Sequence, residues 1–175
     1  MARRIERIAL YAMNPTIRDV TVDDAQAICD IYNPYIAGTA ISFEQQPVSV
    51  ADMQARIRNT TETYPWLVTQ SEDGVIAYAY ATRWRARAAY DRTAESTIYV
   101  KSSLHRSGVA YPLYMALLER LRRQGVHAVV GCITVPNPAS IAFHEKCGFK
   151  KVAHFPQVGR KFDAWVDVGF WQVNL

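Results

Sequence analysis

The residues best suited to chemistry lie in one stretch, in which an apolar run is followed by a basic turn and a second apolar run. We predict a strand over Ile98, Tyr99 and Val100, and a helix that starts near residue 109. The turn and helix start contain small and basic residues: His105, Arg106, Ser107, Gly108, Val109 and Ala110. Helix starts have unpaired backbone N–H groups that can bind phosphate oxygens. The stretch is a candidate phosphate site, and an ordinary strand-to-helix turn gives the same pattern.

A second candidate stretch runs from Asn137 to Phe149. Asn137 followed by proline is typical of a helix start, because Asn caps the first N–H groups and proline needs no N–H there. Polar side chains of this helix that could bind or react are Ser140, His144 and Lys146. On its own, His144 is more typical of a partly buried, hydrogen-bonded histidine than of a catalyst.

One carboxylate stands upstream of the first stretch, on a strand predicted to begin near Thr93. Alternation along this strand places Glu95, Thr97 and Tyr99 on one face and Ser96 on the other. A solvated carboxylate at the start of a strand is the simplest interpretation of Glu95, and a core position is the simplest interpretation of Tyr99. A basic segment precedes the strand. Its residues that could bind a ligand are Trp84, Arg85, Arg87, Tyr90 and Arg92.

The hydrophobic pattern predicts the elements that position these residues. Their order is strand, two helices, three strands, helix, strand, helix and two strands, which indicates a single α/β domain. The predicted ranges are 16–19, 22–32, 49–60, 66–70, 75–81, 93–100, 109–123, 127–135, 138–147, 150–155 and 164–173.

Three local signals sharpen this prediction. Asn33-Pro34 should end the first helix, because proline disfavours a helical conformation in the residue before it. Asp73-Gly74 is a strong hairpin-turn signal. The segment 127–135 is almost wholly apolar, so we expect both faces of this strand to be covered.

Composition sets limits on the kind of protein. The chain has 175 residues, of which 50% are hydrophobic and 21% charged, as is typical of one globular domain. The net charge of +4 suits an anionic ligand, but the basic residues are scattered, so nucleic-acid binding is not expected.

Cysteine spacing and apolar runs set further limits. The cysteines, Cys29, Cys132 and Cys147, lie far apart without metal-ligand spacing, so we expect mostly buried, reduced thiols in a cytoplasmic protein and no metal site. No apolar run is long enough to span a membrane. Residues 1–15 are interpreted as an N-terminal extension and residues 16–175 as the domain.

Taken together, the two stretches resemble the GNAT superfamily of acyl-CoA-dependent N-acetyltransferases. The pyrophosphate loop of that family, Gln/Arg-x-x-Gly-x-Gly/Ala, matches at His105, Gly108 and Ala110. The later motif of the family, Asn-x-x-Ala/Ser-x-x-Leu/Phe-Tyr-Glu-Lys-x-Gly-Phe, matches at Asn137, Ser140, Phe143, His144, Glu145, Lys146, Gly148 and Phe149. His105 departs from the usual Gln/Arg, and His144 replaces the usual Tyr. His before Glu is similar to the phosphinothricin and methionine-sulfone acetyltransferase branch.

The resemblance implies a mixed, twisted and splayed sheet flanked by helices, with acetyl-CoA as co-substrate. It implies that Glu95 is the general base, since an ammonium must lose a proton before its nitrogen attacks a thioester. His144 lies at the position that protonates the leaving thiolate. The backbone of Ile98 to Val100 would pair with the pantetheine arm, the loop 105–110 would hold the pyrophosphate, and Asn137, Ser140 and Lys146 are further cofactor candidates.

For the acceptor, the resemblance implies a phosphinothricin-like amino acid, whose carboxylate and polar end group need cations. The candidate substrate residues are Phe43, Trp84, Arg85, Arg87, Tyr90, Arg92, Lys161 and Phe162. A solvated loop face remains the simpler interpretation of any single arginine among them. The resemblance also implies a homodimer. The alternatives are the same chemistry on another amine or amino acid, or a non-catalytic acyl-CoA-binding domain.

Overall fold

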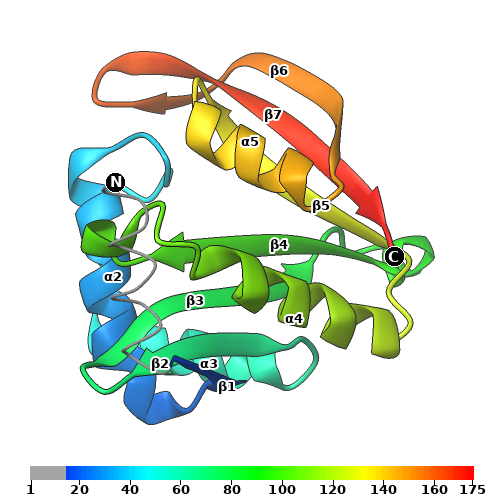
Figure 1. The fold of residues 1–175 in the computed structure, drawn as a ribbon. Coiled ribbons are helices and arrows are strands. Elements are labelled where there is room, and N and C mark those ends of the chain that lie inside the picture. The colour runs from blue at the N-terminus through cyan, green and yellow to red at the C-terminus, as the bar shows by residue number, and fades with distance from the viewer. Residues whose placement is uncertain (1–14) are drawn as a thin grey trace, which may run out of the picture.

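The computed structural model describes residues 15–175, so the predicted extension lies outside the described residues except for its last residue. The element order is the predicted one (Figure 1). The elements are β1 (Thr16–Asp19), α2 (Ala25–Gly38), α3 (Val50–Thr61), β2 (Trp66–Ser71), β3 (Gly74–Arg83), β4 (Thr93–Val100), α4 (Ala110–Arg123), β5 (Ala128–Val135), α5 (Pro138–Lys146), β6 (Lys150–Lys161) and β7 (Ala164–Asn174).

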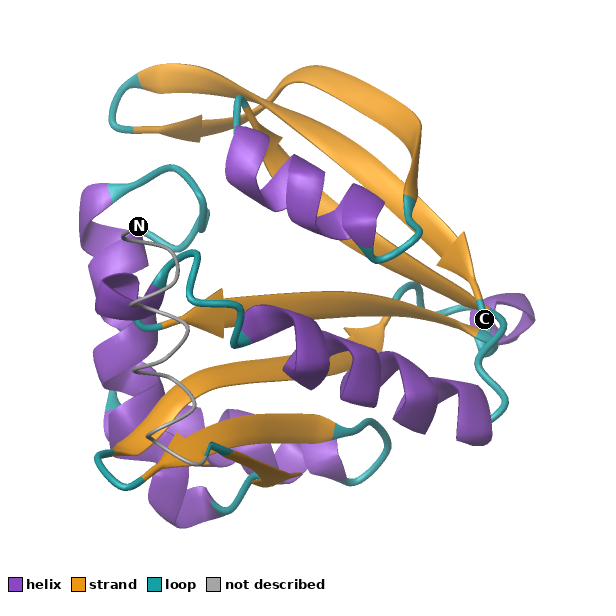
Figure 2. Cartoon of the chain, in the orientation of Figure 1, coloured by secondary structure: helices purple, strands orange, loops and turns teal. Residues whose placement is uncertain are grey.

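All seven strands form one mixed sheet in the order β1-β2-β3-β4-β5-β7-β6. Every neighbouring pair is antiparallel except β4 and β5, which are parallel. The parallel pairing covers only Thr93–Ser96 against Ala128–Gly131. Beyond it the two strands diverge, so the sheet is splayed at its centre (Figure 2). The mixed, splayed sheet expected from the sequence is confirmed.

The core has two parts, one on each face of the sheet. Helix α4 packs on one face against alternate residues such as Leu67 and Ala79. Helices α2 and α3 pack on the other face against Val68 and Tyr78. Because neighbouring residues of β2 and β3 point to opposite faces, the same strands supply both halves of the core.

Helix α4 follows the predicted apolar period. Leu113, Leu117 and Leu121 recur every four residues, and all three are fully buried. Pro112 stands in the first turn, where an N–H is not needed. The predicted hairpin is also confirmed, because Ser71 pairs with Gly74 across the turn between β2 and β3.

Two predicted boundaries were wrong. Helix α2 continues past Pro34 to Gly38, because packing in the following turn outweighs the lost hydrogen bond. Ile36 is buried there, and the Asn33 side chain bonds both backbone groups of Val48. Strand β6 runs to Lys161 and not to residue 155, since β7 pairs with it again beyond an irregular segment.

Strand β5 is less enclosed than its apolar sequence predicts. Residues 128–131 and Ile133 are buried, but Cys132 is exposed. Cys29 and Cys147 are buried, as expected. The side of β5 that carries Cys132 therefore remains open beside the divergence of the sheet.

Within residues 15–175, no helix is long and apolar enough to cross a membrane. The same residues hold no group of three or more His, Cys, Asp and Glu side chains that could bind a metal ion.

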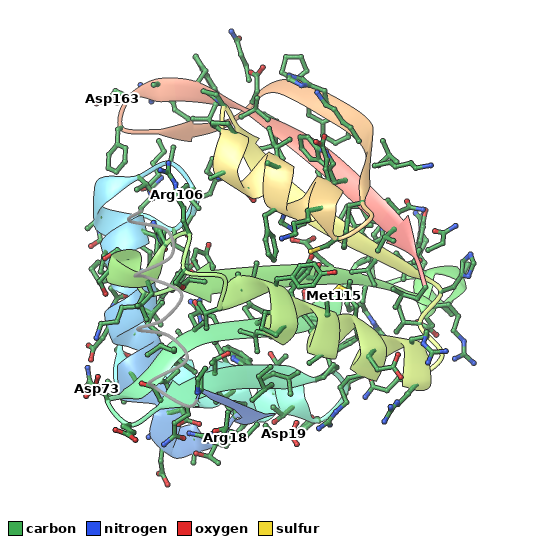
Figure 3. The ribbon with its side chains drawn as sticks, in the orientation of Figure 1. Arg18, Asp19, Asp73, Arg106, Met115 and Asp163 are labelled. Atoms are coloured by element: carbon green, nitrogen blue, oxygen red, sulfur yellow. The ribbon has the colours of Figure 1, made fainter. Side chains whose placement is uncertain are left out.

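We predict that Leu117→Ala lowers the free energy of unfolding by about 2–5 kcal/mol, because it leaves a cavity beneath α4. Met115→Ala is the matched control on the same helix (Met115 is labelled in Figure 3), since this side chain is 38% exposed. The control should change stability by less than about 0.5 kcal/mol in urea denaturation. Equal effects of the two substitutions would contradict this account of the core.

Candidate active site

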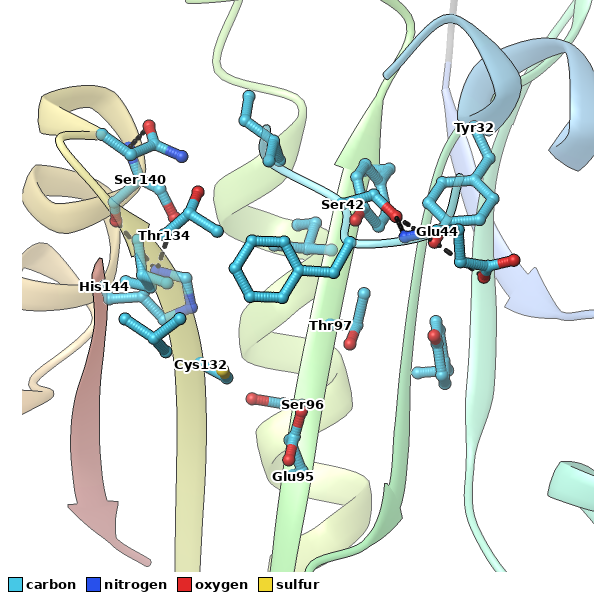
Figure 4. Close-up of a pocket in the computed structure, with 18 residues that line it drawn as sticks. Tyr32, Ser42, Glu44, Glu95, Ser96, Thr97, Cys132, Thr134, Ser140 and His144 are labelled. Carbon is cyan, nitrogen blue, oxygen red and sulfur yellow. Dashed lines mark hydrogen bonds between the residues drawn. The ribbon is translucent and has the colours of Figure 1, made fainter. Parts of the chain in front are cut away.

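A cavity of about 490 Å³ occupies the opening between β4 and β5 (Figure 4). Its walls come from β4, from β5 with α5, and from the connector between α2 and α3. The polar or titratable residues that line it are Tyr32, Ser42, Glu44, Tyr80, Glu95, Ser96, Thr97, Tyr99, Cys132, Thr134, Asn137, Ser140 and His144. Both residues expected to be catalytic therefore lie in one cavity.

Glu95 lines the cavity from the paired part of β4. Burial raises the pKa of its carboxyl group above the ordinary glutamate value. Cys132 lies across the opening on β5, where part of its side chain is accessible; desolvation of the thiol by the cavity walls, together with the charge of Glu95, raises the pKa of that thiol to about 11. A carboxyl with a raised pKa binds a proton more readily than an exposed one, which suits a general base.

His144 approaches the cavity from the last turn of α5 and is 5% exposed. Its Nδ1 lies 2.8 Å from the Ser140 carbonyl oxygen. A carbonyl can only accept, so Nδ1 carries the proton and Nε2 of the neutral ring has a lone pair. Burial lowers the pKa of the imidazole, which favours this neutral form.

The ring of His144 has little freedom to move. It meets Tyr114, Phe143 and Phe149 edge-on, with centroid distances of 5.3–5.6 Å. A Cβ atom at Gly131 would lie 2.8 Å from its Cδ2, so the ring rests directly on the β5 backbone. Packing therefore fixes the orientation of the imidazole.

The connector wall contains residues that sequence patterns did not identify. The Tyr32 hydroxyl lies 2.7 Å from Ser42 Oγ and donates to Glu44 over 3.0 Å. Arg56 forms two hydrogen bonds to Glu44 and lowers the pKa of that carboxyl. Desolvation raises the pKa of Tyr32 to about 12. The connector has no sequence period, so no sequence signal indicated this network.

Two of the predicted substrate residues attach the connector to the β6–β7 hairpin. Phe43 lines the cavity and lies against the backbone of Gly159 so closely that a Cβ there would overlap its ring. Lys161 is buried and donates to the Ser42 carbonyl. Phe162 is 61% exposed, and it lines a separate surface hollow with Lys161.

A second cavity of about 470 Å³ adjoins the first and shares Ile41, Ile98, Tyr99, Asn137 and Ser140 with it. The predicted cofactor residues in its lining are Ile98, Tyr99, Val100, His105, Arg106, Gly108, Val109, Ala110, Asn137, Ser140 and Lys146. Ser107 is buried instead, and its Oγ accepts from the Val109 N–H at 3.4 Å.

Backbone groups of β4 face this second cavity. The Lys101 N–H donates to the Ile76 carbonyl, and Ala77 stands opposite Val100. Antiparallel alternation then directs the N–H and C=O groups of Ile98 and Val100 away from β3. The Ile98 groups and the Val100 N–H face the opening, whereas the Val100 carbonyl accepts from the Tyr35 hydroxyl. An extended ligand with amide groups can pair with this edge as an added strand.

The loop before α4 takes a conformation suited to anion binding. Arg106 and Gly108 both have positive φ, at 65° and 99°, and helix α4 begins at Ala110. Figure 3 labels Arg106 in the loop that precedes this helix. Such a turn points successive N–H groups at a common anion. On the opposite wall, the Asn137 side chain accepts from the Ser140 N–H and caps α5.

The basic segment lies partly beside the first cavity. Trp84, Arg85 and Tyr90 line a smaller cavity with Thr93 and Val130, which share their sheet face with Glu95 and Cys132. The Arg85 guanidinium carbon lies 5.3 Å from the Trp84 ring centroid and 6.0 Å from that of Tyr90.

The other two arginines of the segment lie elsewhere. Arg92 donates to the Gly125 carbonyl over 3.1 Å, which ties it to the turn after α4. Arg87 is exposed and does not line any of the cavities described above.

Comparison with known proteins agrees with this geometry. Residues 17–169 match the family of the acetyltransferase (GNAT) domain. The chain belongs to the GNAT acetyltransferases. The fold and the enzyme class expected from the sequence, an N-acetyltransferase, are thereby confirmed.

Similar proteins indicate to which GNAT enzymes this chain is related. It is 39% identical over 156 residues to phosphinothricin N-acetyltransferase of Streptomyces viridochromogenes, covering 89% of this chain and 85% of the relative. It is 37% identical over 165 residues to L-methionine sulfoximine/L-methionine sulfone acetyltransferase of Pseudomonas aeruginosa, covering 93% and 96%. A phosphinothricin acetyltransferase of Sinorhizobium meliloti, solved in complex with acetyl-CoA, superposes with a TM-score of 0.88 at 32% identity, covering 93% and 89%.

Two substitutions distinguish the helix-capping role of Asn137 from any contact that its side chain makes with a ligand. We predict that Asn137→Ala lowers the free energy of unfolding by about 1 kcal/mol, because the Ser140 N–H loses its partner. Asn137→Asp should keep the stability, since Asp caps equally well, while removing the amide donor. Thermal and urea unfolding of both variants measure this, and a loss of stability in the Asp variant would contradict the capping role.

Proposed function

We propose that this GNAT enzyme transfers the acetyl group of acetyl-CoA to the α-amino group of a phosphinothricin-like amino acid, such as methionine sulfoximine or methionine sulfone. The transfer is direct, within a ternary complex. The observation that carries the proposal is the meeting of two cavities at the divergence of β4 and β5, one with Glu95 and His144 and one with an unpaired strand edge and a helix start. The relatives' substrates support the choice of acceptor.

In this proposal the second cavity holds acetyl-CoA. The pantetheine amides pair with Ile98 and with the Val100 N–H, and the pyrophosphate binds at residues 105–110. Asn137, Ser140 and Lys146 contribute from α5 on the opposite side. The thioester then lies where the two cavities meet, and a β4 backbone N–H can stabilise the oxyanion that forms on it.

Glu95 removes a proton from the acceptor ammonium, and the freed amine attacks the thioester carbon. The lone pair on Nε2 of His144 then takes the extra proton from the attached nitrogen. As the carbon–sulfur bond breaks, His144 gives this proton to the departing thiolate and returns to its neutral form. His144 thus acts as general acid only after it has accepted a proton, which follows from the proton held at Nδ1.

For the acceptor we propose that Arg85 binds the carboxylate or the polar end group, with Trp84, Tyr90 and Phe43 as walls. Arg85 is the predicted cation that lines a cavity on the Glu95 face of the sheet. Arg92 and Lys161 already donate to carbonyls in this structure. Arg87 and Phe162 are exposed, so any role they have in binding requires a rearrangement.

The direct test is release of CoA thiol from acetyl-CoA in the presence of phosphinothricin, methionine sulfoximine or methionine sulfone, with methionine and simple amines as comparisons. We expect turnover with the first three. Turnover only with another amine would show that the proposed acceptor is wrong, while the protein would still be an N-acetyltransferase. Binding of acetyl-CoA without turnover on any amine would indicate a non-catalytic acyl-CoA-binding domain.

We predict that Glu95→Gln lowers kcat by about 10²- to 10⁴-fold near neutral pH, since an amide cannot accept the proton. Affinity for acetyl-CoA, measured by calorimetry, should barely change. In the unaltered enzyme, kcat/KM should rise with pH as Glu95 ionises, above the ordinary glutamate range because burial raises its pKa. The variant should lose this rise. Glu72→Gln, in the exposed β2–β3 turn, is the control, and an unchanged kcat in Glu95→Gln would remove Glu95 from the mechanism.

We also propose that the enzyme is a cytoplasmic homodimer formed through the β6–β7 hairpin. Strand β6 is an edge of the sheet. Large apolar side chains of the hairpin are 45–63% exposed, and these are Val152, Phe155, Val158, Phe162 and Trp165. Such a concentration is unusual for the free surface of a monomer. A two-fold contact with a second copy covers the same patch on both chains.

Trp165→Glu should therefore shift the protein toward the monomer, because it places a charge in the most exposed apolar position of the patch. Light scattering across a dilution series measures the mass. Ile17→Glu, on the opposite edge strand β1, is the matched control and should leave the mass unchanged. A monomeric unaltered protein would overturn the proposed dimer.

A further inference from the structure

Tyr35 joins the two parts of the proposed cofactor site. It extends from α2, and its hydroxyl lies 2.6 Å from the Val100 carbonyl oxygen and 2.6 Å from Nε2 of His105. Tyr35 and His105 both line the second cavity, and their rings lie 6.0 Å apart. A single hydroxyl therefore holds the end of β4 and the first residue of the predicted pyrophosphate loop.

These two short contacts determine where the protons lie. The Val100 carbonyl can only accept, so the one proton of the hydroxyl points to it. The Tyr35 oxygen is then left as an acceptor, and Nε2 of His105 must carry the donated proton. Burial raises the pKa of Tyr35, which keeps its hydroxyl protonated. Neutral His105 consequently presents a bare lone pair at Nδ1.

The charges around His105 favour an anion. Arg106 follows it in the loop, Lys146 enters the cavity from α5, and Lys101 stands at the end of β4. Tyr35 on α2, Tyr99 on β4 and Tyr111 on α4 are the remaining titratable groups beside the cavity. Among residues 15–175, no Asp or Glu lines it.

We propose that Tyr35 is a positioning residue that makes His105 bind the cofactor pyrophosphate as an imidazolium, so that acetyl-CoA binding takes up a proton from solvent. The lone pair at Nδ1 repels a phosphate oxygen, whereas the protonated ring donates from Nδ1 to phosphate and from Nε2 to Tyr35. A Gln or Arg at this position donates without any change in protonation. The inference rests on the proposed binding of acetyl-CoA in the second cavity.

Calorimetry of acetyl-CoA binding at one slightly alkaline pH, in two buffers with different heats of ionisation, measures the protons taken up. On binding acetyl-CoA, the unaltered enzyme should take up more protons than the His105→Gln variant, and the difference should be at most about one proton. His105→Gln should still bind. His127→Gln is the matched control, because His127 is exposed and lies just before β5; it should keep the proton uptake of the unaltered enzyme.

Tyr35→Phe tests the positioning role separately. We expect it to weaken acetyl-CoA binding roughly 3- to 10-fold, the loss of one hydrogen bond, and to reduce proton uptake toward that of His105→Gln. Equal uptake by the unaltered enzyme and His105→Gln would overturn the inference and leave the proposed function intact. If Tyr35→Phe takes up as many protons as the unaltered enzyme, Tyr35 does not position His105, and this part of the inference is overturned. Failure of the unaltered enzyme to bind acetyl-CoA would overturn the proposed function and this inference together.

Discussion

The short parallel pairing of β4 with β5 is the constraint on which the rest of the structure depends. It ends where Ser96 faces Gly131, and the Ser96 hydroxyl secures this point by donating to Val130 and lying 2.7 Å from the Tyr114 hydroxyl. Beyond it, the backbone groups of β4 that would have paired with β5 face a cavity. Unpaired backbone groups are costly when they are buried dry, so this edge favours a ligand with amides.

The same divergence places the two proposed catalytic residues on opposite walls of the cavity. Glu95 belongs to β4, while His144 belongs to α5 and rests on β5. Burial acts on both groups but in opposite directions, because it disfavours whichever form is charged. It raises the pKa of the carboxyl and lowers that of the imidazole. Two groups that can each accept a proton therefore face one cavity, as the proposed proton transfer through a neutral His144 requires.

The α2–α3 connector closes the cavity from a third side and links distant parts of the chain. Glu44 is held by Tyr32 and Arg56, and Phe43 lies against the β6–β7 hairpin at Gly159. One residue of α2, Tyr35, reaches the end of β4 and the loop before α4. Helix α2 therefore supports both cavities of the proposed site.

The sequence by itself determined the order of the elements, the hairpin at Gly74 and the helix starts at Asn137 and near Ala110, because these depend on local periods and caps. It also placed Glu95 on the strand face that lines the cavity. Only the tertiary structure decided that α2 continues past Pro34, since packing from outside the helix offsets the lost bond. Only the tertiary structure brought Tyr35 to His105 and Glu44 to Arg56. Such pairs have no sequence period, because the chain between their members folds back through space.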